Sequence, residues 1–225
     1  MKEIVTRIDI INHLISEYGY KNYLEIGVRD PDQCFNWINC ENKTSVDPKV
    51  EPFGTPPDVE YDYELTSDNF FRMLDSDKLK LSPETLWDII FIDGLHTAEQ
   101  VHRDIENSLN HLSPNGTIVL HDCSPPNQEY AREDYYSILD ENGEPTPWNG
   151  TVWKTIYHFR TSRPDLTVQT VDTDWGVGII RKDPSDPIAH RNIYYSYETM
   201  NENRTEHLGL IHPDQFYEIY GRLNP

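Results

Sequence analysis

Short apolar runs alternate along the chain with stretches in which apolar residues recur every three or four positions. Residues 4–18 show the second pattern, so a helix is predicted there, ending at Gly19. Residues 23–28 form a compact apolar run with β-branched members, which is typical of a buried strand. The same patterns predict further strands at 43–47, 86–92 and 117–120, and helices after Pro31, after Thr66 and from Thr97 through Leu112.

The second half of the chain is less regular. Residues 123–150 are rich in proline, asparagine and acidic residues, and we expect an irregular lid or insertion. A helix is predicted over 151–159. Two strands, 166–171 and 176–180, are joined by an acidic turn and are predicted to form a hairpin at a sheet edge. The polar tail shows only short helical patterns, around 193–201 and 213–220.

Strands that alternate with helical stretches predict an α/β fold with a mostly parallel sheet covered on both faces. Right-handed crossovers then give a Rossmann-like, doubly wound sheet that ends in an antiparallel hairpin. We expect a single domain over residues 1–225. It would have an N-terminal helix in 1–19, a core in 20–182 that carries the 123–150 insertion, and a helical tail in 183–225.

Composition narrows the classes of partner. The 225 residues include 19 Lys plus Arg and 39 Asp plus Glu, a formal net charge of −20, so phosphate-rich partners would be repelled. We therefore expect no nucleic-acid partner. No apolar run approaches the roughly 20 residues of a membrane-spanning helix, so no membrane role is expected. Three cysteines without a CxxC motif suggest free thiols and a cytoplasmic location.

Ligands of such sheets bind beyond the carboxyl ends of the strands, so the residues at those ends are candidates. Acidic or imidazole groups follow four successive predicted strands. These candidates are Glu25, Gly27 and Val28 after the first strand, Asp47 after the second, Asp93 and His96 after the third, and His121 and Asp122 after the fourth.

These residue types favour a ligand that carries a ribose but no phosphates. Asp47 follows the glycine turn by about 20 residues, where a carboxylate binds ribose hydroxyls. Arg29 occupies the place of the second glycine of a dinucleotide-binding turn, which disfavours a pyrophosphate. A floor of carboxylates also suits a cationic sulfonium better than a phosphate.

At this point the sequence resembles class I S-adenosylmethionine-dependent methyltransferases. The run Tyr-Leu-Glu-Ile-Gly-Val at 23–28 looks like their motif I, and Asp47 falls at their ribose-binding acid. The run Phe-Ile-Asp-Gly-Leu-His at 91–96, with the His-Asp pair at 121–122, is similar to a branch that contains sugar and small-molecule O-methyltransferases. The resemblance implies a seven-stranded sheet.

The resemblance also implies a role for each matching residue. Glu25, Gly27 and Val28 would lie by the methionine end and the backbone turn, and Ser67 and Asp68 by the adenine. Asp93 and Asp122 match ligands of a divalent metal such as Mg²⁺ or Mn²⁺. His96 matches a general base, and Asp93 is a second catalytic candidate. Cys123 stands where relatives carry a third oxygen ligand, and because a thiol is a poor ligand for Mg²⁺, metal dependence stays open.

Structural roles compete with these assignments. His96 could cap the following helix, Asp93 could stabilise that helix N-terminus, and His121 is expected to pack inward. We also expect the five tryptophans to pack in the core or lid rather than to form acceptor platforms.

The sequence thus predicts a cytoplasmic S-adenosylmethionine-dependent O-methyltransferase that acts on a sugar or small polar metabolite, in glycan or secondary-metabolite biosynthesis. Three alternatives remain: an NAD(P)-dependent oxidoreductase, a non-methylating, metal-dependent hydroxylase-like relative, and a catalytically silent scaffold. A homodimer is left open as the assembly.

Overall fold

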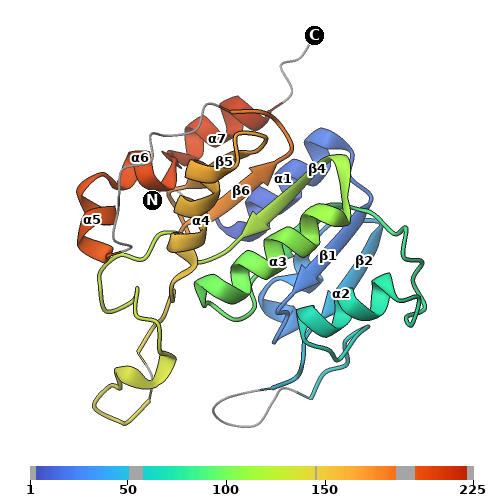
Figure 1. Ribbon diagram of the computed structural model, residues 1–225, viewed down its shortest axis with the longest axis horizontal. Coiled ribbons are helices and arrows are strands. Elements are labelled where there is room, and N and C mark those ends of the chain that lie inside the picture. Colours follow the sequence, from blue (N-terminus) through green and yellow to red (C-terminus); the bar gives the residue numbers. More distant parts are fainter. Residues whose placement is uncertain (1–3, 51–57, 145, 186–195, 222–225) are drawn as a thin grey trace.

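The computed structural model describes residues 4–50, 58–144, 146–185 and 196–221. A seven-stranded sheet in the order β2-β1-β3-β4-β6-β5-β7 forms its centre (Figure 1). The strands are β1 Asn22–Ile26, β2 Asn42–Val46, β3 Trp87–Ile92, β4 Leu112–Leu120, β5 Thr167–Val171, β6 Val177–Arg181 and β7 Leu210–Ile211. Strand β6 is antiparallel to both neighbours and the other pairs are parallel, which confirms the predicted Rossmann-like, mostly parallel sheet.

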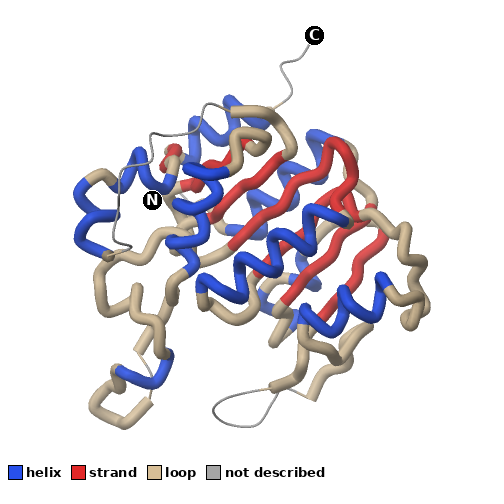
Figure 2. The backbone as a smooth tube through the Cα atoms, in the orientation of Figure 1, coloured by secondary structure: helices blue, strands red, loops and turns tan. Residues whose placement is uncertain are grey.

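Helices cover both faces of the sheet (Figures 1 and 2). The apolar faces of α1 (Arg7–Tyr18) and α7 (Pro213–Tyr220) belong to the core on one side. Those of α2 (Ser67–Asp75), α3 (Ala98–Asn110) and α4 (Val152–Ser162) belong to the core on the other, together with residues of α5 (Tyr197–Glu202) and α6 (Arg204–Leu208). Short 3-10 turns lie at η1 Pro31–Gln33, η2 Phe35–Trp37 and η3 Tyr135–Ser137.

The continuous apolar character of the strands follows from this two-sided burial. Successive residues of a strand point to opposite faces, so Leu24 and Ile26 of β1 join the α2–α4 core while Tyr23 joins the α1 core. Glu25, two residues after Tyr23, shares the α1 side. A carboxyl group is therefore embedded between sheet and helix, next to the end of β1.

The chain leaves β1 to one side to form β2 and returns to the other side to form β3. The carboxyl ends of β1 and β3 therefore flank the switch point, where ligands of open α/β sheets bind. Gly27, with φ +85°, makes the tight turn there. A Cβ on Gly27 would lie 2.4 Å from the carbonyl oxygen of Asp93, so the two strand-end turns touch through their backbones.

Three expectations from the sequence need correction. The helix predicted after Pro31 is two 3-10 turns. The β5–β6 hairpin does not form the sheet edge, because the two residues of β7 pair with β5 outside it. The predicted helical tail, residues 183–225, is not wholly helical, because it contains β7. The tail pattern 193–201 falls partly outside the described residues, and α5 begins at Tyr197.

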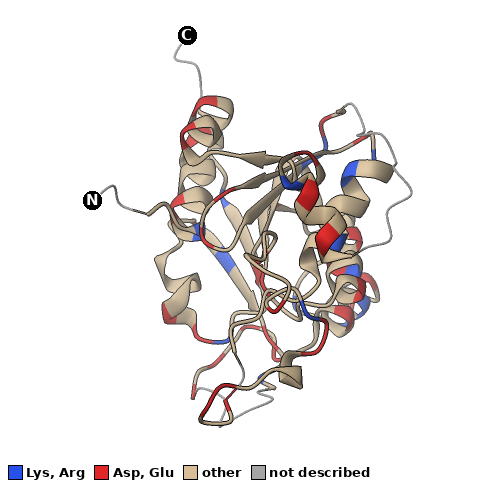
Figure 3. Ribbon diagram, turned by 90° about the vertical axis from the view of Figure 1, so that its left-hand side faces the viewer, with Lys and Arg blue, Asp and Glu red and all other residues tan. Residues whose placement is uncertain are grey.

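Beyond the carboxyl ends of the strands, the chain between β4 and α4 is irregular except for η3, as predicted (Figure 2). Within the described ranges no helix is long and apolar enough to cross a membrane. Acidic residues are spread over helices and loops (Figure 3), and the sequence has 39 of them against 19 basic residues.

Candidate active site

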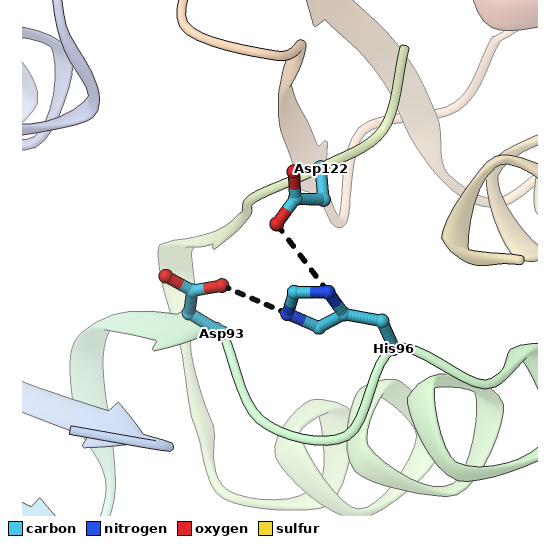
Figure 4. A group of neighbouring side chains, drawn as sticks. All are labelled: Asp93, His96 and Asp122. Atoms are coloured by element: carbon cyan, nitrogen blue, oxygen red, sulfur yellow. Dashed lines mark hydrogen bonds and ion pairs between the residues drawn. The ribbon is translucent and has the colours of Figure 1, made fainter. Parts of the chain in front are cut away.

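The ends of β3 and β4 bring Asp93, His96 and Asp122 together (Figure 4). His96 lies between the two carboxylates, with Nε2 3.3 Å from Oδ1 of Asp93 and Nδ1 3.5 Å from Oδ2 of Asp122. One possible ligand atom from each residue lies within 4.8 Å of the others. The structure therefore brings together three residues that the sequence places after the third and fourth strands.

Backbone contacts hold each member in place. The amide of Asp93 donates to the carbonyl oxygen of Ile26 at 2.9 Å, which joins the ends of β3 and β1. Asp122 has φ +59°, a left-handed conformation that Asp tolerates better than most residues. The His96 imidazole stacks on Trp148, with ring centroids 5.1 Å apart.

His96 does not cap α3. The first helical amide, of Ala98, instead donates to Oγ1 of Thr151 at 2.7 Å, a residue far along the sequence. The carbonyl oxygen of His96 accepts the Thr151 amide at 2.8 Å. The imidazole is thus left to the two carboxylates and Trp148.

His121 belongs to the cluster, so the expectation that it only packs inward is wrong. Its Nδ1 lies 3.1 Å from Asp122 Oδ2 and 3.5 Å from Asp93 Oδ1. Its Nε2 lies 3.4 Å from Oδ1 of Asp174, which also pairs with Arg7 at 3.2 Å. Helix α1 and the β5–β6 turn therefore extend the charge network, and the sequence offered no spacing that would join Arg7 to Asp174.

The network holds its groups in their charged forms. Burial alone would raise the pKa of Asp93, but the adjacent His121 and His96 outweigh burial and hold it well below its usual range. Burial alone would lower the pKa values of both histidines, yet the surrounding carboxylates raise them. For Asp174, His121 and Arg7 outweigh burial and lower the pKa to about 2.

A further amide joins Asp122 from the irregular segment. Asn149 is 0% exposed, and its Nδ2 donates to Asp122 Oδ1 at 2.6 Å. Its buried Oδ1 has no hydrogen-bond partner among the described residues. The Asn-Gly dipeptide at 149–150 signals a turn, but nothing in the sequence placed it at this site.

Cys123 points away from the cluster. Its buried Sγ lies 3.5 Å from the carbonyl oxygen of His121, and it packs against Gly178. Burial raises the pKa of the thiol well above its usual value, so Cys123 stays protonated and is unsuited to metal ligation.

The donor set fits a divalent cation. Asp93 and Asp122 offer carboxylate oxygens and His96 an imidazole nitrogen, while the unpaired amide oxygen of Asn149 lies beside Asp122. Carboxylates and carbonyls suit Mg²⁺ and Mn²⁺, and an imidazole is better matched to a transition metal.

Glu25 is buried beside this cluster, at 1% exposure. The hydroxyl of Tyr23 donates a hydrogen bond to its Oε2. Burial raises the pKa of Glu25 to about 8, against the opposing effect of that hydrogen bond. Val28 is also buried, so it can contact a ligand only through its backbone atoms or through the small part of its surface that is exposed at the turn.

Asp47 closes the turn at the end of β2. Its Oδ2 accepts the amide of Arg29 at 2.9 Å and its Oδ1 accepts the amide of Lys49 at 2.7 Å. These bonds orient the carboxylate, and each oxygen retains a second lone pair for a ligand hydroxyl. The geometry fits a ribose-binding acid.

Ser67 and Asp68 start α2 and bond to α3. Nε2 of Gln100 donates to Oγ of Ser67 at 3.1 Å, and Arg103 pairs with Asp68 at 3.3 Å. Their predicted contact with adenine stays a prediction.

The tryptophans divide into distinct environments. Trp87 and Trp153 are buried as expected, and Trp148 stacks on His96. The packing expectation is wrong for Trp37, which is 61% exposed, and Trp175, which is 44% exposed. Trp175 is the one that meets the site, since its carbonyl oxygen lies 3.4 Å from Nδ2 of Asn149.

Comparison with known proteins finds a family that is similar to part of the chain. Residues 36–123 match a family described as a methyltransferase domain. This stretch, which is less than half of the chain, is therefore similar to a methyltransferase domain. It contains Asp47, Ser67, Asp68 and the whole Asp93–His96–Asp122 cluster. No curated protein sequence matches the chain significantly.

Comparison with solved structures finds similar chains at low sequence identity. One is the O-methyltransferase TomG from Streptomyces achromogenes, involved in tomaymycin synthesis and in complex with S-adenosylmethionine; it is 12% identical, covers 77% of this chain and 78% of that one, and has a TM-score of 0.50. Another is an O-methyltransferase from Bacillus cereus with S-adenosylhomocysteine (15% identity, 81% and 84% coverage, TM-score 0.48). A putative O-methyltransferase from Klebsiella pneumoniae gives 14% identity, 81% and 83% coverage and a TM-score of 0.47.

The family match confirms the resemblance to S-adenosylmethionine-dependent methyltransferases. It disfavours the oxidoreductase alternative. The antiparallel β6 between β4 and β5 also departs from the all-parallel strand order of the dinucleotide-binding fold.

Proposed function

We propose that this methyltransferase domain transfers the methyl group of S-adenosylmethionine to a hydroxyl of a small polar acceptor, a sugar or a similar metabolite. The observation that carries the proposal is the Asp93–His96–Asp122 cluster, which lies at the carboxyl ends of β3 and β4 inside the residues that match a methyltransferase domain. A base and two carboxylates at this edge suit proton removal from a hydroxyl.

The cofactor would lie across the ends of β1, β2 and β3. Asp47 would accept hydrogen bonds from the ribose hydroxyls, since two backbone amides already orient its carboxylate. Glu25, Gly27 and Val28 would line the methionine end, and Ser67 and Asp68 the adenine end. A field of carboxylates favours the sulfonium over a neutral thioether.

His96 would act as the general base and Asp93 would orient it. Methyl transfer is an in-line displacement with a good leaving group, so the protein has to align the acceptor and remove its proton. Asp93 at 3.3 Å from Nε2 and Trp148 under the ring fix the imidazole. His96 accepts the hydroxyl proton only when it is itself neutral.

As an alternative to His96 acting as the base, Asp93 and Asp122 would hold a divalent cation, and His96 would then be a further donor in reach. Such a cation would lower the pKa of the acceptor hydroxyl. Activity measured with and without Mg²⁺ or Mn²⁺ tests whether the cation is required. A homodimeric assembly and a cytoplasmic location belong to the same proposal.

Calorimetry with S-adenosylmethionine and S-adenosylhomocysteine tests the cofactor assignment. We expect micromolar binding by the wild type and at least a roughly tenfold loss in Asp47→Ala, because the ribose would lose its acceptors. Asp165→Ala, an exposed site before β5 at the opposite sheet edge, is the matched control. If neither ligand binds the wild type, the proposal is wrong.

Turnover separates the proposal from a silent scaffold. Methyl transfer to a panel of sugars and polar alcohols, with and without Mg²⁺ or Mn²⁺, is expected to be lost in His96→Ala while cofactor binding stays. Cofactor binding without methyl transfer to any acceptor would support a scaffold, and oxygen consumption that depends on metal would support the hydroxylase-like alternative.

A further inference from the structure

The turn between β5 and β6 presents an exposed aromatic ring beside the cluster. Trp175 is 44% exposed although it is one of the largest apolar side chains. Tyr130, from the irregular segment, stacks on it with ring centroids 5.4 Å apart and planes inclined by 25°. Tyr130 thus covers one face of the indole, while the residue as a whole stays substantially exposed.

The backbone of this turn is fixed to the end of β4. Asp174, Trp175 and Gly176 all have positive φ angles, which is uncommon for a residue as bulky as Trp. The amide of Ser124 donates to the Trp175 carbonyl oxygen at 2.8 Å, and that of Cys123 donates to the Gly176 carbonyl oxygen at 3.0 Å. The backbone from which the indole projects is therefore held by residues that directly follow Asp122.

Asn149 ties the same turn to the proposed catalytic groups. Its Nδ2 reaches both Asp122 Oδ1, at 2.6 Å, and the Trp175 carbonyl oxygen, at 3.4 Å. Its buried Oδ1 is unpaired among the described residues, a costly state that a bound group would relieve. Trp175, Asn149 and Asp122 form one connected unit.

A cavity of about 200 Å³ lies at this turn, lined by Trp175 together with Ser124, Pro126, Asp172, Thr173 and Asp174. It is smaller than the roughly 300 to 1,000 Å³ of pockets for drug-sized ligands, which indicates a single small ring. Asp174 is engaged by Arg7 and His121, whereas the exposed carboxylate of Asp172 has no side-chain partner in the described ranges. The cavity therefore offers an apolar face and free acceptor oxygens.

We propose that this cavity is the acceptor subsite and that it holds an uncharged sugar ring. The C–H face of a pyranose packs on the indole of Trp175, and its hydroxyls donate to the Asp172 carboxylate. The two aspartates repel an anionic substituent. This inference rests on the proposed function, because it names the substrate class of that same site.

The test uses saturation-transfer NMR on the full chain with three probes: methyl β-D-glucopyranoside, glucose 6-phosphate and catechol. We expect the pyranoside to bind most tightly, its affinity to fall at least roughly tenfold in Trp175→Ala, and part of it to return in Trp175→Phe. Trp37→Ala, which removes another exposed tryptophan, is the matched control and should leave pyranoside binding unchanged. Asp172→Asn should weaken the binding of the pyranoside and reduce the difference in affinity between the pyranoside and glucose 6-phosphate.

Circular dichroism and S-adenosylhomocysteine binding confirm that each variant is folded and separate the two proposals. If the wild type does not bind S-adenosylhomocysteine, the proposed function is wrong. If Trp175→Ala keeps the wild-type affinity for the pyranoside, only the proposal of the sugar subsite is wrong. Absence of pyranoside binding to the wild type, or tighter binding of catechol, would also overturn the assignment of a sugar ring.

Discussion

His96 lies between two carboxylates that stabilise its protonated form, which conflicts with its proposed work as a base. Because Asp93 and Asp122 outweigh burial and raise its pKa above the ordinary 6.5, the imidazole becomes a base only at higher pH than an unperturbed histidine. We expect kcat/KM to rise with pH and to level off above that raised pKa.

A pH–rate profile of wild type and His96→Gln checks this. The variant should lose roughly 10²-fold or more in rate, together with the pH-dependent limb, while its affinity for S-adenosylhomocysteine is kept. If kcat/KM of the wild type did not change between pH 6 and 9, His96 would not be the general base.

Glu25 makes the stability of the protein depend on pH. Its pKa is raised by burial from 4.5 to about 8, so between these values the folded chain keeps a proton that the unfolded chain releases. Stability contributed by the neutral carboxyl is complete below pH 4.5 and is lost as pH rises through 8, by at most about 1.4 kcal/mol per pH unit.

Glu25→Gln keeps the shape and stays neutral, so urea unfolding should find it more stable than wild type at pH 8.5 and nearly equal at pH 5. Glu84→Gln, on an exposed turn, should leave the pH dependence as it is. A parallel pH dependence of Glu25→Gln and wild type would show that the buried carboxyl is not its source.

At the scale of elements, α3 owes its N-terminal cap to the start of α4. Oγ1 of Thr151 accepts the Ala98 amide, while the side chain of Thr97, the residue at the N-cap position, makes no capping bond. Thr151→Val removes the oxygen and keeps the branched shape. We expect it to lower the free energy of unfolding by about 1 kcal/mol, measured by urea denaturation.

Thr97→Val is the matched control and should change the stability by less than about 0.5 kcal/mol. If Thr97→Val lowered the free energy of unfolding more than Thr151→Val, Thr97 would be the capping residue instead.

The same contact explains how far the sequence could lead. The strands and α3 follow from local apolar patterns, and the ends of parallel strands meet by topology, so Asp93, His96 and Asp122 could be predicted together. Thr151, Asn149 and Asp174 reach the site through pairings between distant segments that leave no periodic signal. Strand β7 is two residues long, too short for any pattern to reveal it.

Gly150 illustrates the limit at one position. With φ +65°, it passes so close to the loop between β3 and α3 that a Cβ would lie 2.1 Å from the His96 carbonyl oxygen. From the sequence it is an ordinary turn glycine. Only the fold shows that its missing side chain lets the irregular segment reach the active site.

At the scale of the whole molecule, 39 acidic against 19 basic residues give a formal net charge of −20, so the potential around the protein is negative. Near neutral pH, S-adenosylmethionine carries one net positive charge and S-adenosylhomocysteine none, so the two ligands differ in how strongly this potential attracts them. Salt screens this attraction, since the Debye length falls from about 30 Å at 0.01 M to about 3 Å at 1 M. Added salt should therefore weaken the binding of S-adenosylmethionine and leave that of S-adenosylhomocysteine nearly unchanged.

We expect the affinity for S-adenosylmethionine to weaken several-fold, on the order of tenfold, between 20 mM and 500 mM NaCl, and that for S-adenosylhomocysteine to change less than about twofold. Calorimetry at matched pH measures both. Such a divergence would also favour release of the neutral product after each transfer, because the product loses the charge that the substrate brought in. An equal salt dependence of the two ligands would mean that the acidic surface is solvated and that recognition of the sulfonium is confined to groups in direct contact.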